Sequence, residues 1–180
     1  GDSTTIFNKG QMIERMIELE YKAKSETENN APYYYQLGLA FYNTTFFGNQ
    51  WQAMNYFRSG STWNRLGDAK DGVFKHPSCV FGNKEVLDVN RALFYFEKTR
   101  LLSRNPELTA RACFMAAKCE QKLYFMSDAY RPEYNSNTIP QLPEQYLINV
   151  KRLKEEFVDT EFYEYIIEEC KYFRVYTEKI

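Results

Sequence analysis

The sequence predicts an all-α protein of short antiparallel helices, about seven in number, with two long irregular loops. Glycine and proline are scarce, at 8 and 6 of 180 residues, which favours helices over a turn-rich β fold. Apolar residues recur three and four positions apart along most of the chain, as on the buried face of a helix. No alternating pattern is long enough to predict a strand. The length suits a single domain that covers residues 1–180.

The first third of the sequence includes three predicted helices. The first has an apolar stripe opposite a charged one, and the run from Glu26 to Asn30 breaks this pattern. Pro32 suits the start of the next helix, because proline is tolerated in a first helical turn. Gly48 and Asn49 mark a turn before the third. These helices cover about residues 6–28, 32–43 and 51–65.

Caps and apolar spacing predict the remaining helices. Asn105 and Pro106 end one helix and open the next, and Asp159 with Thr160 forms a cap before the last. These helices cover about residues 86–103, 106–126, 144–156 and 160–172. The segments 66–85 and 127–143 are irregular. Loops of this length are often functional or covered by a partner.

The second and third helices carry an informative spacing of large and small residues. On the second, Tyr34, Leu37, Gly38 and Phe41 stand at i, i+3, i+4 and i+7. They therefore share one helical face, on which Gly38 lets another helix approach closely. The third helix carries Ala53, Phe57 and Gly60 at i, i+4 and i+7.

These two patterns resemble the tetratricopeptide repeat, whose first helix carries an aromatic residue, Leu-Gly and a second aromatic residue. The second helix of that repeat carries Ala, an aromatic residue and Ala, and Gly60 stands here in the last place. A second partial match follows at Ala92, Phe96 and Thr99. The resemblance covers about residues 31–126, and the segment 66–85 breaks its period. It implies a superhelix of antiparallel helical hairpins, whose concave face binds peptides.

Two phrases, FYNTTFFGNQW and DTEFYEYIIEECKYFRVY, are similar to segments of long, uncharacterised repeat-containing proteins of Bacteroidetes. This second resemblance implies an exported protein in the cell envelope or periplasm, and it brings no known activity. Because the sequence starts at Gly1 without a methionine, we expect it to be the C-terminal fragment of a longer protein.

The aromatic stretch 33–57 supplies the candidate binding residues. Tyr34, Phe41 and Phe57 stand at packing positions and are expected in the core, and residues 31–57 contain no charged side chain. The rings left over cannot all face the same seam. Tyr35 and Tyr42 are candidates for a concave ligand surface. Phe46 and Phe47, at a turn, are candidates for contact with the missing N-terminal region of the same protein.

Charge and cysteine content give few signals of a ligand. The net charge is −1, and the densest basic set is balanced by Glu97 and Glu107, so we expect no nucleic-acid binding. That basic set consists of Lys98, Arg100, Arg104 and Arg111. No apolar run is long enough to span a membrane. Cys113 and Cys119 are six positions apart, about 240° around a helix, so we expect two separate buried thiols. A disulfide that includes Cys79 stays open.

A search for catalytic and metal-binding motifs gives no strong candidate. His76 and Cys79 form HxxC in the loop 66–85, without the further ligands that zinc needs. Asp68 and Asp71 lack the order of calcium ligands in an EF-hand. Glu164 and Glu168 are read as a solvated helix face rather than a hydrolytic carboxylate pair. We therefore expect no enzyme activity, no metal and no cofactor.

The function expected from these observations is a non-catalytic module for protein–protein interaction or scaffolding, with a protein or peptide as its partner. The alternative is a carbohydrate-binding or glycan-uptake accessory module, in which exposed tyrosines stack on sugar rings.

Overall fold

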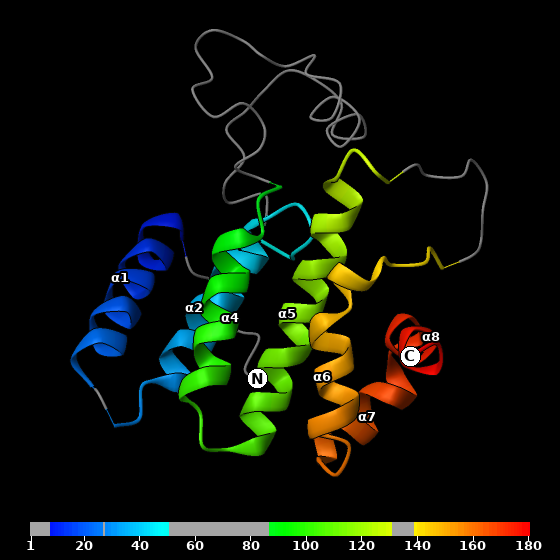
Figure 1. Ribbon diagram of the computed structural model, residues 1–180. Coiled ribbons are helices and arrows are strands. Elements are labelled where there is room, and N and C mark those ends of the chain that lie inside the picture. Colours follow the sequence, from blue (N-terminus) through cyan, green and yellow to red (C-terminus); the bar gives the residue numbers. More distant parts are fainter. Residues whose placement is uncertain (1–7, 27, 51–86, 131–138) are drawn as a thin grey trace, which may run out of the picture.

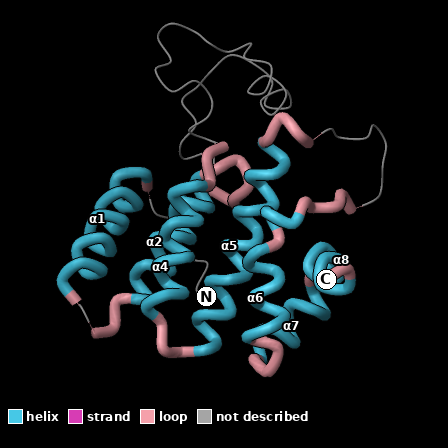
Figure 2. Tube along the Cα trace, viewed as in Figure 1, coloured by secondary structure: helices cyan, strands magenta, loops and turns pink. Residues whose placement is uncertain are grey.

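The computed structural model describes residues 8–26, 28–50, 87–130 and 139–180. In these ranges the protein forms seven α-helices and one 3₁₀ turn, and no strand (Figure 2). The α-helices are α1 (Lys9–Ser25), α2 (Ala31–Thr44), α4 (Asn90–Leu102), α5 (Pro106–Met126), α6 (Ile148–Glu156), α7 (Glu161–Glu169) and α8 (Lys171–Glu178), and the 3₁₀ turn is η4 (Glu144–Tyr146). The predicted all-α class is confirmed for this part of the chain.

Helices that follow one another pack as antiparallel neighbours (Figure 1). The helices α1, α2, α4, α5 and α6 lie side by side, with α2 against α4 and α5 between α4 and α6. The last two helices, α7 and α8, close the far side next to α5 and α6. Figure 1 views α8 nearly along its own axis, whereas α5 and α6 run lengthwise, so α8 crosses them.

The helix boundaries follow the caps that the sequence predicts. Asn105 accepts hydrogen bonds from the amides of Glu107 and Leu108, with Pro106 in the first turn of α5. Thr160 accepts one from the amide of Tyr163 at the start of α7. Each side chain satisfies amides that have no partner within the first helical turn.

The C-terminal region differs from the prediction. The helix expected over 160–172 is two helices, because Cys170 is extended, with φ −108° and ψ 94°, and separates α7 from α8. The change of direction lets the Tyr176 hydroxyl donate a hydrogen bond to the Pro140 carbonyl at 3.1 Å. The helix expected over 144–156 is likewise the 3₁₀ turn η4 followed by α6. The predicted helix 51–65 and loop 66–85 lie outside the described residues.

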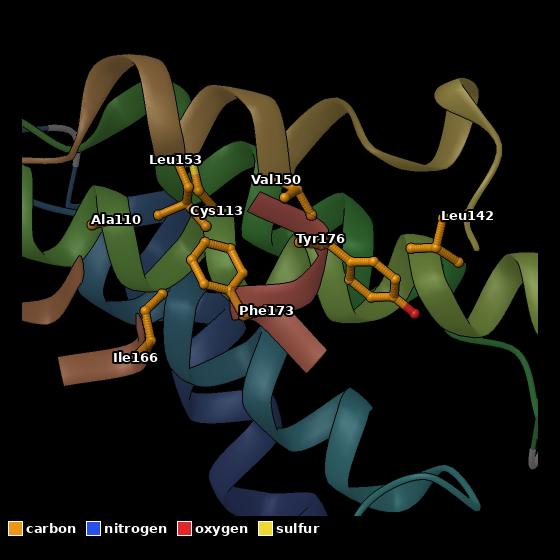
Figure 3. Packing of buried hydrophobic residues seen from close by; sticks show 9 residues of the cluster. Ala110, Cys113, Leu142, Val150, Leu153, Ile166, Phe173 and Tyr176 are labelled. Carbon is orange, nitrogen blue, oxygen red and sulfur yellow. The ribbon is translucent and has the colours of Figure 1, made fainter. Parts of the chain in front are cut away.

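The buried apolar residues form three clusters, and α5 contributes to two of them. One contains Ala110, Cys113, Ala117, Leu142, Val150, Leu153, Ile166, Phe173 and Tyr176 (Figure 3). The second contains Tyr42, Val89, Ala92, Phe96, Met115, Ala116 and Cys119. The third, between α1, α2 and α4, contains Leu19, Ala23, Tyr34, Leu37 and Tyr95. Cys113 and Cys119 are free, buried thiols in different clusters, as their spacing predicts.

Gly38 lies in close contact with the Phe96 ring, where α2 packs against α4. A Cβ atom placed on Gly38 would lie 2.6 Å from Cε1 of Phe96, a distance that side chains do not adopt. The Phe96 ring is fully buried and therefore has little room to move. The predicted close approach at Gly38 is confirmed, and Phe96 is the residue that requires it.

Two glutamates of α5 bind the first amides of the helices that follow. Glu120 accepts hydrogen bonds from the backbone amide of Asn149 at 3.1 Å and from its side-chain amide at 2.7 Å, at the start of α6. Glu107 accepts from the amides of Glu161 and Phe162, at 2.9 and 3.1 Å, at the start of α7. A carboxylate at a helix N-terminus satisfies free amides and interacts favourably with the helix dipole.

The Glu120 bond lies within a larger polar network between α4, α5 and α6. The side-chain amide of Asn149 also donates to Glu97 at 2.8 Å, and Arg152 donates to the side-chain oxygen Oδ1 of Asn149 at 2.7 Å. Burial raises the pKa of the Glu120 carboxyl, against the opposing effect of the Asn149 bonds. Every buried side-chain nitrogen and oxygen of the described residues has a hydrogen-bond partner.

We predict that Gly38→Ala lowers the free energy of unfolding by about 1–3 kcal/mol, because the added methyl group overpacks against Phe96. In a helix interior, alanine is otherwise more stabilising than glycine, so a loss of stability in this variant identifies the steric clash. Denaturant unfolding measures the change. Gln36→Ala, at an exposed position of the same helix, is the control and should stay near wild type. Equal or greater stability of Gly38→Ala would contradict the close approach.

We predict that Glu120→Gln changes the pH dependence of stability. Burial gives the Glu120 carboxyl a higher pKa in the folded state than in the unfolded state. Such a group stabilises the fold most at pH values below its unfolded-state pKa, and this stabilisation is lost as pH rises through its folded-state pKa. Glutamine does not titrate. The free energy of unfolding of the variant relative to wild type should therefore rise as pH increases above the usual glutamate pKa of about 4.3.

Denaturant unfolding at several pH values measures this difference. Glu155→Gln, at an exposed position of α6, is the matched control for the loss of one carboxylate. A relative stability of Glu120→Gln that falls with rising pH would show that the fold favours the charged carboxylate.

Candidate functional site

The four candidate residues from the sequence lie along α2 and the turn that follows it. The Tyr35 ring is half-buried, with its centroid 5.8 Å from that of Phe96, and burial raises the pKa of its hydroxyl. Phe46 and Phe47 are half-buried and pack edge to face, with ring centroids 6.0 Å apart. The structure therefore leaves part of these three rings accessible.

Tyr42 requires a correction, because the sequence predicts an accessible ring at this position. Its side chain is only 3% exposed and packs in the cluster that contains Met115 and Cys119 of α5. It lies on the face of α2 that meets its neighbours, so its ring is not available to stack on a ligand. Burial raises the pKa of its hydroxyl, which therefore stays protonated.

Two lysines of α5 lie against these rings. Lys118 Nζ is 5.1 Å from the ring centroid of Tyr42 and 5.8 Å from that of Phe114. Lys122, one turn later, has its Nζ 5.4 Å from the ring of Phe47 and 5.2 Å from that of Phe125. Each ammonium group thus lies near two aromatic rings, a geometry that attracts cations.

The same two lysines line a pocket between α5 and α8, which we call the α5–α8 pocket. Its volume is about 290 Å³. Three of the lining residues, Val150, Phe173 and Tyr176, are labelled in Figure 3. The full lining consists of Phe114, Ala117, Lys118, Gln121, Lys122, Phe125, Val150, Cys170, Tyr172, Phe173 and Tyr176. The walls are therefore mostly aromatic and aliphatic, with two ammonium groups among them.

A series of hydrogen bonds fixes the polar side of the pocket. Lys122 Nζ donates to Gln121 Oε1 at 3.0 Å, and Gln121 Nε2 donates to the Tyr176 hydroxyl at 3.2 Å. That hydroxyl donates to the Pro140 carbonyl oxygen. Burial is also the main cause that lowers the pKa of Lys122, to about 8.

No ion pair joins Lys118 or Lys122 to a carboxylate among the described residues. By contrast, Lys22 pairs with Glu18 at 3.1 Å and Lys151 pairs with Glu144. The basic residues that the sequence singled out lie elsewhere: Arg100 pairs with Glu97 at 2.8 Å, and Lys98 lies over Tyr34. The pocket thus contains positive charge that the described part of the protein does not balance.

Sequence reasoning missed Lys118 and Lys122, although the sequence contains a signal for them. Phe114, Lys118 and Lys122 recur every four residues, and Phe125 follows at the next turn, so all four share one face of α5. The sequence contains no comparable signal that α8 lines the pocket, because the position of α8 depends on the break at Cys170.

The pocket brings together one thiol, two amines and two phenols. The protein's single histidine, His76, and Cys79 lie outside the described residues. Within the described ranges there is no group of three or more His, Cys, Asp and Glu side chains that could hold a metal ion. In the same ranges, no helix combines the length and apolar character needed to cross a membrane.

No family model, curated protein or solved structure matches the sequence.

We predict that the ε-carbon NMR resonance of Lys122 titrates with a midpoint near pH 8. Lys122→Met identifies the resonance by removing it. Phe125→Ala should raise the midpoint, because it lets water reach the ammonium group. A wild-type midpoint at the usual lysine value of about 10.4 would contradict the burial of Lys122 in the pocket wall.

Proposed function

We propose that the protein is a non-catalytic, tetratricopeptide-like scaffold that binds a protein or peptide partner. The α5–α8 pocket is the seat for a side chain of that partner. The observation that carries the proposal is the presence of this pocket, with mostly apolar and aromatic walls, between elements of a helical array.

The packing of α2 against α4 supports the repeat-like part of the proposal. In the tetratricopeptide repeat, small residues let large rings of a neighbouring helix approach. Gly38 has this role towards Phe96, and Ala92 and Thr99 lie on the same buried side of α4 as Phe96. The antiparallel arrangement of successive helices is also the arrangement that such a repeat needs.

The dimensions and walls of the pocket support the binding part of the proposal. A volume of about 290 Å³ is at the small end of the range for ligand sites. It therefore suits one or two side chains better than a large ligand. Tyr172 lines the pocket and is 48% exposed, so its ring is accessible to a partner. Buried aromatic contacts of this kind contribute strongly to binding at protein interfaces.

We predict that peptides selected by panning a random library on the purified protein bind at the pocket. Tyr172→Ala should weaken their binding about tenfold, which corresponds to about 1.4 kcal/mol. Tyr165→Ala is the matched control, because Tyr165 is an exposed tyrosine of α7, at 60%, that does not line the pocket. Isothermal titration calorimetry measures both affinities, and circular dichroism checks the fold of each variant.

Two outcomes would contradict the proposal. Panning could yield no peptide that binds above background, or Tyr165→Ala could weaken binding as much as Tyr172→Ala does. The exposed Tyr172 ring also fits the alternative of a carbohydrate-binding module, since sugars stack on accessible rings. A glycan-array signal lost in Tyr172→Ala, without peptide binding, would favour that alternative.

A further inference from the structure

The two carboxylates of α5 bind the helices that follow it, and two of its lysines line the pocket. The carboxylates are Glu107 and Glu120, and both bind amides of following helices. Lys118 and Lys122 face the α5–α8 pocket. Both carboxylates of the helix that carries the lysines therefore take part in bonds that stabilise the fold.

The two lysines retain hydrogen-bonding capacity. An ammonium group carries three N–H donors. Among the described residues, Lys122 donates one hydrogen bond, to Gln121. Lys118 makes two ring contacts and donates no hydrogen bond within those residues. A cation over a ring is attracted by the quadrupole of the ring but keeps its charge and its donors.

The position of the lysines relative to the apolar wall restricts the ligand. Both line the same pocket as Ala117, Val150 and Phe173. An anionic group bound at the lysines is thus next to a space for an apolar group. Charge-assisted bonds between ammonium and carboxylate groups are shorter and stronger than neutral ones, particularly in partly buried sites.

We propose that Lys118 and Lys122 form a carboxylate-binding site, and that the occupant of the α5–α8 pocket is a peptide in which a carboxylate adjoins an apolar side chain. This inference rests on the proposed function and specifies the chemistry of the partner. The carboxylate is that of a peptide C-terminus or of an acidic side chain, and the two sources are separated by the choice of peptide.

The protonation of Lys122 supplies a second readout. Its pKa of about 8 means that its charge is lost as pH rises from 7 to 9, so affinity for a carboxylate falls over this range. Among the described residues, the other titratable groups around the pocket and its lysines are Lys118, Cys119, Glu120, Tyr42, Tyr130, Cys170, Tyr172 and Tyr176. Burial raises the pKa of Cys119, Tyr42 and Tyr176, which stay neutral over this range. A Cys170→Ser background excludes titration of that thiol.

The test uses two matched pairs of short peptides and the protein of residues 1–180. The first pair is acetyl-glycyl-phenylalanine as the free acid and as the amide. The second is acetyl-glutamyl-phenylalanine amide and acetyl-glutaminyl-phenylalanine amide. NMR titration of the Lys118 and Lys122 ε-carbon resonances measures binding. In at least one pair, the acid should bind about tenfold more tightly than its neutral counterpart.

Two double variants locate the effect. Lys118→Met with Lys122→Met should abolish the preference for the acid. Because this variant lacks both lysine resonances, isothermal titration calorimetry with the peptide pairs measures its affinities instead. Lys22→Met with Lys24→Met removes the same charge from α1 and should retain the preference. In the wild type, the preference should shrink from pH 7 to pH 9, as Lys122 loses its charge with a pKa of about 8.

The outcomes separate this inference from the function on which it rests. Equal binding of acid and amide in both pairs overturns the carboxylate site. So does a preference that survives in the Lys118 and Lys122 variant. If Tyr172→Ala still weakens the binding of library peptides in either case, the proposed peptide-binding function is supported and only the carboxylate site is wrong. If neither these peptides nor library peptides bind, the proposed function fails as well.

Discussion

The arrangement of the C-terminal half depends on the hydrogen bonds that two glutamates of α5 make to the first amides of α6 and α7. The N-cap residue of α6 supplies no side-chain hydrogen bond, and the Asn149 amide is satisfied by Glu120 instead. At α7, Thr160 binds one amide and Glu107 binds two more. Since both acceptors belong to one rigid helix, they fix where the following helices begin. The pocket between α5 and α8 is a consequence of that placement.

The spacing of charges along α5 also explains why the pocket is positively charged. Acidic and basic residues pair on a helix when they are three or four positions apart, and no acidic residue of α5 stands at that distance from Lys118 or Lys122. Glu120 is two positions from each lysine, so it lies on another side of the helix and binds Asn149, whereas both lysines lie among aromatic rings. The low polarity of those surroundings lowers the pKa of Lys122. The same division of charge thus stabilises the fold and gives the pocket its chemistry.

Local sequence signals predicted the helices and much of the core, but they did not predict contacts between distant residues. The caps at Asn105 and Thr160 and the seam from Tyr34 to Gly38 follow from local spacing, and the structure contains them. The burial of Tyr42 also follows from spacing, because Tyr42 stands four positions after Gly38 and eight after Tyr34, on the same side of α2. The break at Cys170 places Tyr176 where it forms hydrogen bonds with Gln121 and Pro140. Because these partners are far apart in sequence, the pocket was not predictable from local pattern.

The contact of Gly38 with Phe96 joins two helices that residues 45–89 separate in the sequence. A methyl group at position 38 would overlap the buried Phe96 ring, so the two positions constrain each other across this separation in the sequence. A larger residue at position 38 therefore requires a smaller one at position 96, and the two positions should change together during evolution.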